Sequence, residues 1–342
     1  MAVMLGALLL AAACGSDDDS SGADPGGAPS TEQGDGADRP VVRLQGLSGG
    51  TGAVALKVIE LRGLDEKYGF KGEFQYIPAD AALQNFLAGE SDVSFDAGPL
   101  DLAIAANEGE DVVAMGPAIT NAVRVIVRED SDVQSIEDLV GKRFGQYGDD
   151  STGSLYLAYL LERFYGIDYF EDFELVTQAP PALIPLLETN QIDAALNFQP
   201  HLANAATSLG TRVVYDPDDE WQEETGGRLW STLQATRVSW IEANPELAEG
   251  VHDAWCEAAT WMNENIDELV SEPEYIDLFG LEGEALTTLA EQMREDDPFF
   301  GCDWNDELVD GLDQIVSGVA EQGALFSEVP AGLFRTIDEI VG

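Results

Sequence analysis

Repeated alternation of short apolar runs with amphipathic stretches constrains the fold of this chain most strongly. From Val41 onward, runs of strand length are followed by stretches with helical periodicity, and turn residues separate them. Strands that alternate with helices in this way form a parallel sheet covered by helices. The first part of the chain predicts strands at 41–47, 74–77, 93–95, 112–115 and 123–128, with helices at 53–68, 81–88 and 99–107.

The same order of elements restarts after residue 134. It predicts strands near 144–145 and at 173–176, 194–198 and 212–215, helices at 154–165, 182–188 and 202–208, and a polar loop at 216–227. A strand at 229–238 then leads back, and residues 241–342 are mainly helical. We therefore predict two α/β lobes, lobe 1 from residues 40–128 and 229–342 and lobe 2 from residues 129–228.

Two lobes joined by two chain crossings predict a hinge and a cleft. Ligands of open α/β sheets bind outside the carboxyl ends of the strands, where helix N-termini point. Two facing lobes would bring two sets of such loops to one cleft, and closure about a hinge is a common response to ligand.

The N-terminal segment has a different character from the rest of the chain. Residues 1–13 are apolar and small and lead to Cys14, a stretch that fits the apolar region of a secretory signal and is too short to span a membrane. The sequence Ala11-Ala12-Ala13-Cys14 resembles a bacterial lipobox, although Ala11 stands where leucine is usual. Residues 15–39 are rich in Gly, Ser, Asp and Pro, which predicts a disordered tether behind a lipidated Cys14.

The charge balance excludes one class of function. The chain has 16 basic and 65 acidic residues, a formal net charge of −49. Nucleic-acid binding depends on Lys and Arg contacts with phosphates, so we expect no nucleic-acid partner. The acidic residues are scattered, which is typical of a solvated, self-repelling surface and of a soluble monomer.

Two cysteines remain if Cys14 carries a lipid. Cys256 and Cys302 then form a pair, and an even remainder in an exported protein predicts a disulfide. Two buried free thiols are the alternative. We find no metal-ligand spacing around either cysteine and expect no metal or cofactor.

Several segments together resemble the ABC-importer binding proteins for nitrate, sulfonates, taurine and thiamine-pyrimidine precursors. The first is 135–145, at the entry to lobe 2, and the second is the Ser151-Thr152-Gly153-Ser154 loop. The third is 193–200, where Gln199 stands in place of the usual Glu, and the fourth is 244–246 together with the helix through Trp261. The resemblance implies a type II periplasmic-binding-protein fold with a two-strand hinge and a helical C-terminal segment. It also implies a non-enzymatic protein on the outer face of the cell membrane that delivers a small organic solute to ABC permease and ATPase subunits.

The candidate ligand-binding residues lie in loops that the pattern places at the cleft. Each has a structural alternative: a plain turn for 49–52, helix capping for Asp96 and for 151–153, and core packing for Trp230. Arg124 and Arg128 alternate on a strand and are expected to pair with surface carboxylates rather than bind an anion. The candidates are Gly49, Gly50, Thr51, Gly52, Asp96, Gly98, Ser151, Thr152, Gly153, Asn197, Gln199 and Trp230.

Two other functions remain open at this point. A ligand sensor could present the same closed form to a membrane receptor, and the sequence does not separate this from import. A related fold serves pyrimidine synthases, which use His, Cys and iron, but His201 and His252 have no partner at ligand spacing. We also find no Ser-His-Asp order typical of hydrolases.

Overall fold

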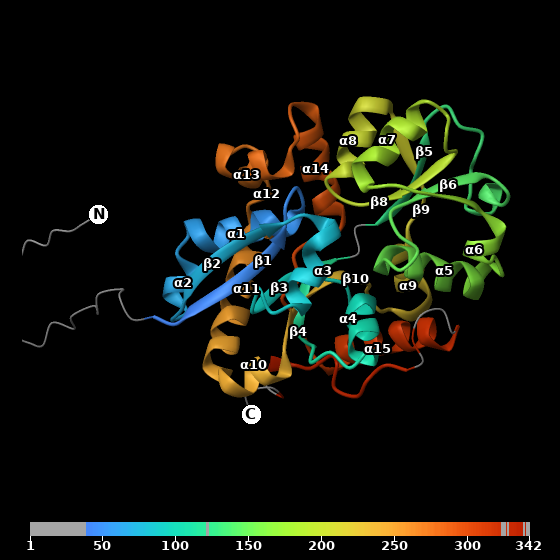
Figure 1. Cartoon of the computed structure of the whole chain (residues 1–342). Helices are drawn as coiled ribbons and strands as arrows, with labels where there is room; N and C mark the ends of the chain where they lie inside the picture. The colour runs from blue at the N-terminus through green and yellow to red at the C-terminus, as the bar shows by residue number, and fades with distance from the viewer. Residues whose placement is uncertain (1–38, 121–122, 323–325, 327, 338, 340–342) are drawn as a thin grey trace, which may run out of the picture. The chain divides into compact units, whose positions relative to one another are not determined.

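A computed structural model describes residues 39–120, 123–322, 326, 328–337 and 339 (Figure 1). Cys14 and the tether up to residue 38 lie outside the described residues. The strands are β1 Val41–Leu47, β2 Lys71–Ile77, β3 Val93–Ala97, β4 Val113–Thr120, β5 Arg124–Arg128, β6 Arg143–Gln146, β7 Glu174–Thr177, β8 Ala194–Asn197, β9 Thr211–Tyr215 and β10 Trp230–Thr236.

The helices cover these strands and form the C-terminal part. They are α1 Thr51–Leu61, α2 Leu64–Lys67, α3 Ala79–Leu87, α4 Pro99–Asn107, α5 Thr152–Tyr165, α6 Tyr169–Asp172, α7 Pro180–Glu188, α8 His201–Leu209, α9 Pro217–Thr225, α10 Val238–Ala243, α11 Pro245–Glu264, α12 Ile266–Leu269, α13 Pro273–Phe279, α14 Glu284–Glu295 and α15 Asp306–Glu321, with a 3-10 turn at Glu137–Leu139.

Ten strands form two five-stranded sheets with the same internal plan. The first has the order β2-β1-β3-β10-β4 and the second β7-β6-β8-β5-β9. In each sheet the first three strands are parallel, and one strand that follows a crossing between the sheets, β10 or β5, is antiparallel to its neighbours. This mixed α/β arrangement confirms the fold class expected from the sequence.

The two halves also resemble each other in a matching ion pair. Arg43 is the third residue of β1 and pairs with Asp92, which precedes β3, at 2.6 Å. Arg143 opens β6 and pairs with Asp193, which precedes β8, at 2.7 Å. In both pairs the carboxylate also accepts the arginine's own backbone N–H. Each pair therefore fixes the start of the central strand of its sheet, β3 or β8, relative to the neighbouring strand, β1 or β6.

The crossing lies earlier than we expected. The prediction assigned residues up to 128 to the first half, but β5 is hydrogen-bonded between β8 and β9 of the second sheet. The alternation of Arg124 to Arg128 identifies a strand without identifying its partners, because strand pairing is set by residues distant in sequence. The first crossing therefore falls between β4 and β5.

Two helical predictions needed correction. The helix expected at 53–68 is divided, because Gly63 adopts a left-handed conformation with φ 62° between α1 and α2. The loop expected at 216–227 contains α9, where Asp216 caps the N-terminus and Trp221 is fully buried. The nine residues of α9 are mostly polar, so the apolar pattern did not predict a helix here, although Asp216-Pro217 is a regular start signal.

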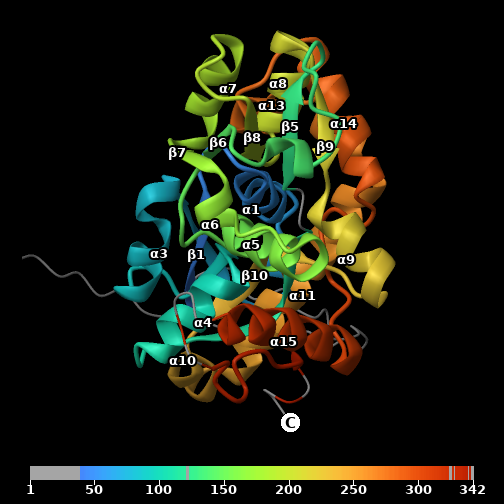
Figure 2. The same cartoon turned by 90° about the vertical axis from the view of Figure 1, so that its right-hand side faces the viewer.

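The long helix α11 packs against the first sheet and carries much of its core. Trp255 stacks on Phe95 of β3 with ring centroids 4.5 Å apart, and its indole N–H donates to the Gly301 carbonyl at 2.8 Å. Helix α14 packs both on α12 and on α8 of the second half, and the turned view shows α14 beside α8 (Figure 2). Among the described residues, no helix is long and apolar enough to cross a membrane.

Candidate functional site

The N-terminal ends of α4 and α5, one from each half, meet at the predicted cleft. A Cβ added to Gly98, the N-cap of α4, would lie 2.2 Å from the hydroxyl oxygen of Thr152, the first residue of α5. Only glycine permits this approach without displacing a side chain. The structure thus brings together Gly98 and Thr152, two of the residues selected from the sequence.

Thr152 has a free hydrogen-bonding group at this contact. Its side chain is buried, and its hydroxyl has no hydrogen-bond partner among the described residues. The neighbouring N-cap is already satisfied, because Ser151 accepts from the Ser154 amide and donates to the Gly148 carbonyl. A buried hydroxyl without a partner costs free energy, so a polar ligand atom here would compensate for it.

Tyr147 lies beside the contact between Gly98 and Thr152, on the side of the second half. Its hydroxyl lies where a Cβ on Gly153 would be, at 2.1 Å, and its ring packs edge-on against Phe198 at 5.2 Å. Burial raises the pKa of Tyr147, and the nearby Asp101 carboxylate raises it further. Glycine at position 153 is therefore required by the aromatic ring above it, in addition to its place in the first turn of α5.

The loop between β1 and α1 forms part of the candidate site on the side of the first half. Gly49 is exposed with φ 76°, and Gly50 is the N-cap of α1 without a side-chain acceptor from the described residues. Thr51 and Gly52 are buried in the first turn. Such an uncapped N-terminus leaves backbone N–H groups that can bind a ligand atom.

Asp96 does not cap α4, which was one of the two roles expected for it. Its carboxylate accepts the Leu47 N–H at 2.5 Å and lies against Gly52, where a Cβ would be 2.3 Å from Oδ1. The start of α4 is instead capped through Asp101, which accepts the Gly98 N–H at 3.2 Å. Sequence analysis missed Asp101, although Gly98 and Asp101 have the spacing of a capping box.

Both carboxyls at this site are weak acids. Burial raises the pKa of Asp96 to about 7 and that of Asp101 to about 7. Their hydrogen bonds from Leu47 and Gly98 lower these values only partly. Near neutral pH each group can therefore exchange a proton, so each can accept from a ligand or donate to it.

Asn197 and Gln199 use their amides within the protein. Asn197 donates to the Pro180 carbonyl at 3.0 Å and accepts the Phe198 N–H. Gln199 donates to Gln292 of α14 at 2.6 Å and accepts the Ala203 N–H. Asn197 thus braces the second half and Gln199 joins the second half to α14, and a role in binding ligand stays a prediction.

Trp230 is a core residue with one unused donor. Its ring lies against Gly301 and Pro117, and its carbonyl accepts the Tyr156 hydroxyl at 3.3 Å. The indole N–H is buried without a hydrogen-bond partner among the described residues. Core packing, one of the two alternatives considered, describes this position; a contact with ligand stays a prediction.

Both arginines pair with carboxylates as expected, but only Arg128 does so at the surface. Arg128 pairs with Asp130 at the surface, at 2.9 Å. Arg124 instead lies in the interior with 12% of its side chain exposed, between Asp216 and Asp296. Residues four apart on a strand lie on the same face of the sheet, so the local pattern does not distinguish the buried ion pairs of Arg124 from the exposed pair of Arg128.

The raised carboxyl pKa values predict that the protein is more stable in mild acid. In the folded state these groups keep protons that the unfolded chain, with a pKa of 3.8, has already released, so stability is lost as pH rises through the folded values. His201, whose pKa burial lowers to about 4, and His252 act in the opposite direction below pH 6.5, but they are fewer. The carboxyls are Asp96, Asp101 and Asp216 with a pKa of about 7 and Asp218 with a pKa of about 6.

We expect the melting temperature to be higher at pH 5.5 than at pH 8 by at least about 2–4 °C, which corresponds to roughly 1 kcal/mol. The double variant Asp96→Asn/Asp101→Asn should reduce this difference in calorimetry, while Asp216 and Asp218 keep their part of it. A wild-type melting temperature that rises steadily from pH 5.5 to pH 8 would contradict the assignment.

Comparison with known proteins agrees with this fold. The family model described as NMT1/THI5 like matches residues 75–268. Among solved structures, the aliphatic sulphonate binding protein SsuA from Escherichia coli has a TM-score of 0.70 at 18% identity, covering 86% of this chain and 91% of that one. SsuA from Xanthomonas axonopodis pv. citri bound to MOPS has a TM-score of 0.71 at 16% identity, covering 88% and 100%.

An enzyme shares the same architecture. The desulfurization enzyme DSZB has a TM-score of 0.62 at 13% identity, covering 89% of this chain and 99% of that one. No curated protein matches the chain in sequence. The two sheets, their antiparallel crossing strands and the facing helix ends define the type II periplasmic-binding-protein class. Because the family model covers more than half of it, the chain belongs to the NMT1/THI5-like family.

Proposed function

We propose that the protein is a lipid-anchored solute-binding protein that captures a small organic molecule between its two halves and delivers it to an ABC importer. The approach of Thr152 to Gly98 carries this proposal. At this contact a helix end from one half meets a helix end from the other, and the halves are connected by two chain crossings. The contact also buries the Thr152 hydroxyl, which has no hydrogen-bond partner among the described residues. Helix N-termini and an unused hydroxyl suit a polar ligand.

The ligand chemistry follows from the charges at the contact. Asp101 lies at the contact and Asp96 lies against Gly52 in the neighbouring loop, and both have a pKa of about 7. Arg124, on the first strand after the crossing, pairs with Asp216 and Asp296. We therefore favour a neutral or amine-bearing organic molecule over a simple inorganic anion, although the similar structures include sulfonate-binding proteins.

A thermal-shift screen tests this proposal. The panel contains nitrate, taurine, alkylsulfonates including MOPS, aminopyrimidines, aromatic acids and polyamines. A ligand at 100 times its dissociation constant adds about 2.7 kcal/mol of stability, a shift of several degrees. If only inorganic anions shift the melting temperature, the proposed ligand class is wrong.

Replacing Gly98 with alanine should weaken ligand binding without unfolding the protein. The backbone at Gly98 has φ −71°, which alanine adopts freely, so the added methyl acts only through its clash with Thr152 and Asp101. If closure needs this approach, we expect the dissociation constant to rise at least about tenfold, because the binding-competent state is less populated. Isothermal titration with a screen hit measures the change.

The control for this variant is Gly311→Ala in α15, where a Cβ meets no described heavy atom within 4 Å. It should bind ligand as the wild type does. Equal affinity in Gly98→Ala and Gly311→Ala would show that ligand capture does not need the two helix ends to meet.

Replacing Cys14 with alanine should release the protein from membranes. The proposal of an anchor rests on the sequence of residues 1–39, since residues 1–38 lie outside the described residues. Without the thiol no diacylglycerol can be attached, so the variant should move to the soluble fraction on expression in a bacterium. Membrane association that survives the substitution would remove the lipid anchor from the account.

A further inference from the structure

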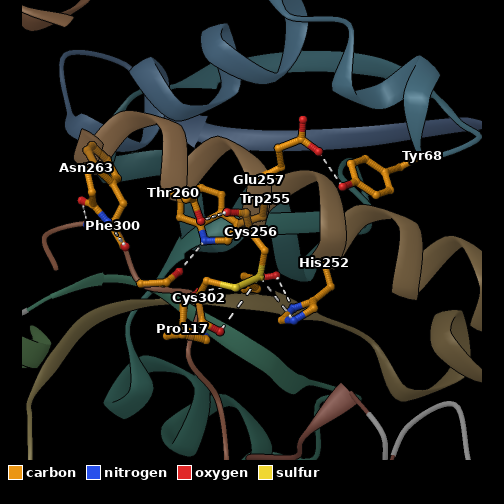
Figure 3. Close-up of a disulfide and its surroundings, with 12 residues drawn as sticks. Tyr68, Pro117, His252, Trp255, Cys256, Glu257, Thr260, Asn263, Phe300 and Cys302 are labelled. Atoms are coloured by element: carbon orange, nitrogen blue, oxygen red, sulfur yellow. Dashed lines mark hydrogen bonds between the residues drawn. A yellow bond between two sulfur atoms is a disulfide. The ribbon is translucent and has the colours of Figure 1, made fainter. Parts of the chain in front are cut away.

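Three metal-binding groups lie together outside the cleft, on α11 and on the segment after α14 (Figure 3). The ligand atoms of His252, Cys256 and Cys302 all lie within 4.8 Å of one another. His252 and Cys256 are four residues apart, so they share one face of the helix. The two cysteines form a disulfide, and in this state neither sulfur is a thiolate.

The orientation of the His252 ring is fixed by its neighbours. Gln234 donates through Nε2 to the Pro117 carbonyl at 2.7 Å, so its oxygen is the atom that faces Nδ1 of His252, at 3.1 Å. An amide oxygen only accepts hydrogen bonds, and therefore Nδ1 carries the proton and Nε2 does not. A ligand histidine in metal sites is commonly held in this way, by a hydrogen bond from its other nitrogen.

The unprotonated nitrogen is directed at sulfur. Nε2 of His252 lies 3.5 Å from Sγ of Cys256. A disulfide sulfur has no hydrogen to donate, so a buried lone pair faces a group that cannot satisfy it. The ring is also confined, because a Cβ on Gly116 would lie 2.9 Å from Nδ1 of His252. The disulfide alone leaves this arrangement unexplained.

We propose that reduction of the Cys256–Cys302 disulfide opens a site for one thiophilic divalent metal ion such as Zn²⁺, bound by His252 Nε2 and two thiolates. In tetrahedral zinc sites the Zn–S distance is about 2.3 Å and the Zn–N distance about 2.0–2.1 Å, which places nitrogen and sulfur roughly 3.5 Å apart. His252 and Cys256 already have this separation. Water would fill the fourth position.

The chemistry balances with an external reductant. A phosphine supplies two electrons and becomes a phosphine oxide with oxygen from water; the S–S bond breaks and each sulfur gains one proton. Metal binding then releases both protons, because the thiolate is the ligand. Both cysteines are only partly buried, so reductant and metal ion can reach them.

The experiment needs a signal that depends on sulfur ligation. A protein with a formal net charge of −49 attracts divalent cations to its surface carboxylates, so total metal content is not informative. Co²⁺ bound by thiolates has a charge-transfer absorption in the near ultraviolet that carboxylates do not produce. The chain carrying Cys14→Ser is titrated with Co²⁺ before and after reduction by a phosphine, which offers no competing thiol.

We expect no charge-transfer band in the oxidised protein and a band that saturates at one ion per chain after reduction. Cys256→Ser and Cys302→Ser should each weaken it strongly, and His252→Gln should lower Co²⁺ affinity at least about tenfold. His201→Gln, which changes the other histidine, should have no effect. Circular dichroism recorded in parallel shows whether the reduced protein is folded with the ion bound.

Three results would overturn the proposal. One is the absence of the band after complete reduction, whether or not the chain remains folded. Another is a band of equal affinity in His252→Gln, because the site would then be a dithiolate without the histidine. A band that forms only on an unfolded chain would show that the folded cluster does not bind the ion.

Discussion

Replacing Arg124 with methionine should lower the free energy of unfolding by about 3–5 kcal/mol at neutral pH, the usual cost of breaking a buried ion pair by removing one partner. The Arg124 guanidinium pairs with Asp216 at 2.5 Å and with Asp296. Their side chains are only 15% and 10% exposed, so neither carboxylate can recover full hydration. Burial already raises the pKa of both, and without Arg124 the cost of their charge is no longer offset.

The same reasoning predicts how the defect depends on pH. The two carboxyls can escape the cost by taking up protons, so Arg124→Met should recover part of its stability at pH 5. Arg128→Met is a matched control, because Arg128 lies four residues away on β5 and pairs with Asp130 at the surface. It should melt close to the wild type. Equal destabilisation of the two variants in urea unfolding would contradict the buried network.

Removing the disulfide is the second large effect. The bond joins residues 46 apart in sequence, and a loop of this length predicts about 4 kcal/mol of stabilisation through the restricted unfolded chain. Cys256→Ala/Cys302→Ala should therefore melt lower by about 8–16 °C, at roughly 2–4 °C per kcal/mol for a domain of a few hundred residues.

The variant should nevertheless fold, because other contacts hold the same segment to α11. Asn263 donates to the Phe300 carbonyl at 2.7 Å and accepts the Phe300 N–H at 3.0 Å, and Trp255 donates to Gly301. Cys14→Ala, which removes the remaining cysteine, serves as the control and should not change the melting temperature. A double variant that melts within about 2 °C of the control would show that the bond adds little.

The alternating pattern predicted the architecture well because strands and helices leave local periodic signals. The repeated order of elements was enough to predict two α/β halves, and the ion pairs in the two halves have nearly the same spacing, 49 residues from Arg43 to Asp92 and 50 from Arg143 to Asp193. The position of the crossing was not predictable from this pattern. Whether Arg124 to Arg128 pairs with one sheet or the other depends on β8 and β9, which come about 70 to 90 residues later.

The candidate site was predictable in part for a similar reason. Loops before helices pointed to Gly98 and Thr152, but nothing in the sequence shows that these two residues meet. Asp101 had a capping-box signal that was not used. The burial of Arg124 could not be predicted, because its partners Asp216 and Asp296 lie 92 and 172 residues away and Arg128 has the same local pattern.

His252 and Cys256 show where a usable signal was passed over. Their four-residue spacing on an amphipathic helix places both on one face, so the prediction that His252 has no partner at ligand spacing was wrong. The third member, Cys302, and the hydrogen bond from His252 to Gln234 emerge only from the fold.

Capture of a small molecule between the two halves is the central claim, and one measurement tests it without a guess about the ligand. The wild-type protein, Gly98→Ala and Gly311→Ala are each incubated with a small-molecule extract of bacterial culture, separated from free solutes, and analysed by native mass spectrometry. We predict one retained compound on the wild type and Gly311→Ala, released on unfolding, and at least about tenfold less on Gly98→Ala. Retention of nothing by the wild type, or of the same compound equally by all three, would contradict the account.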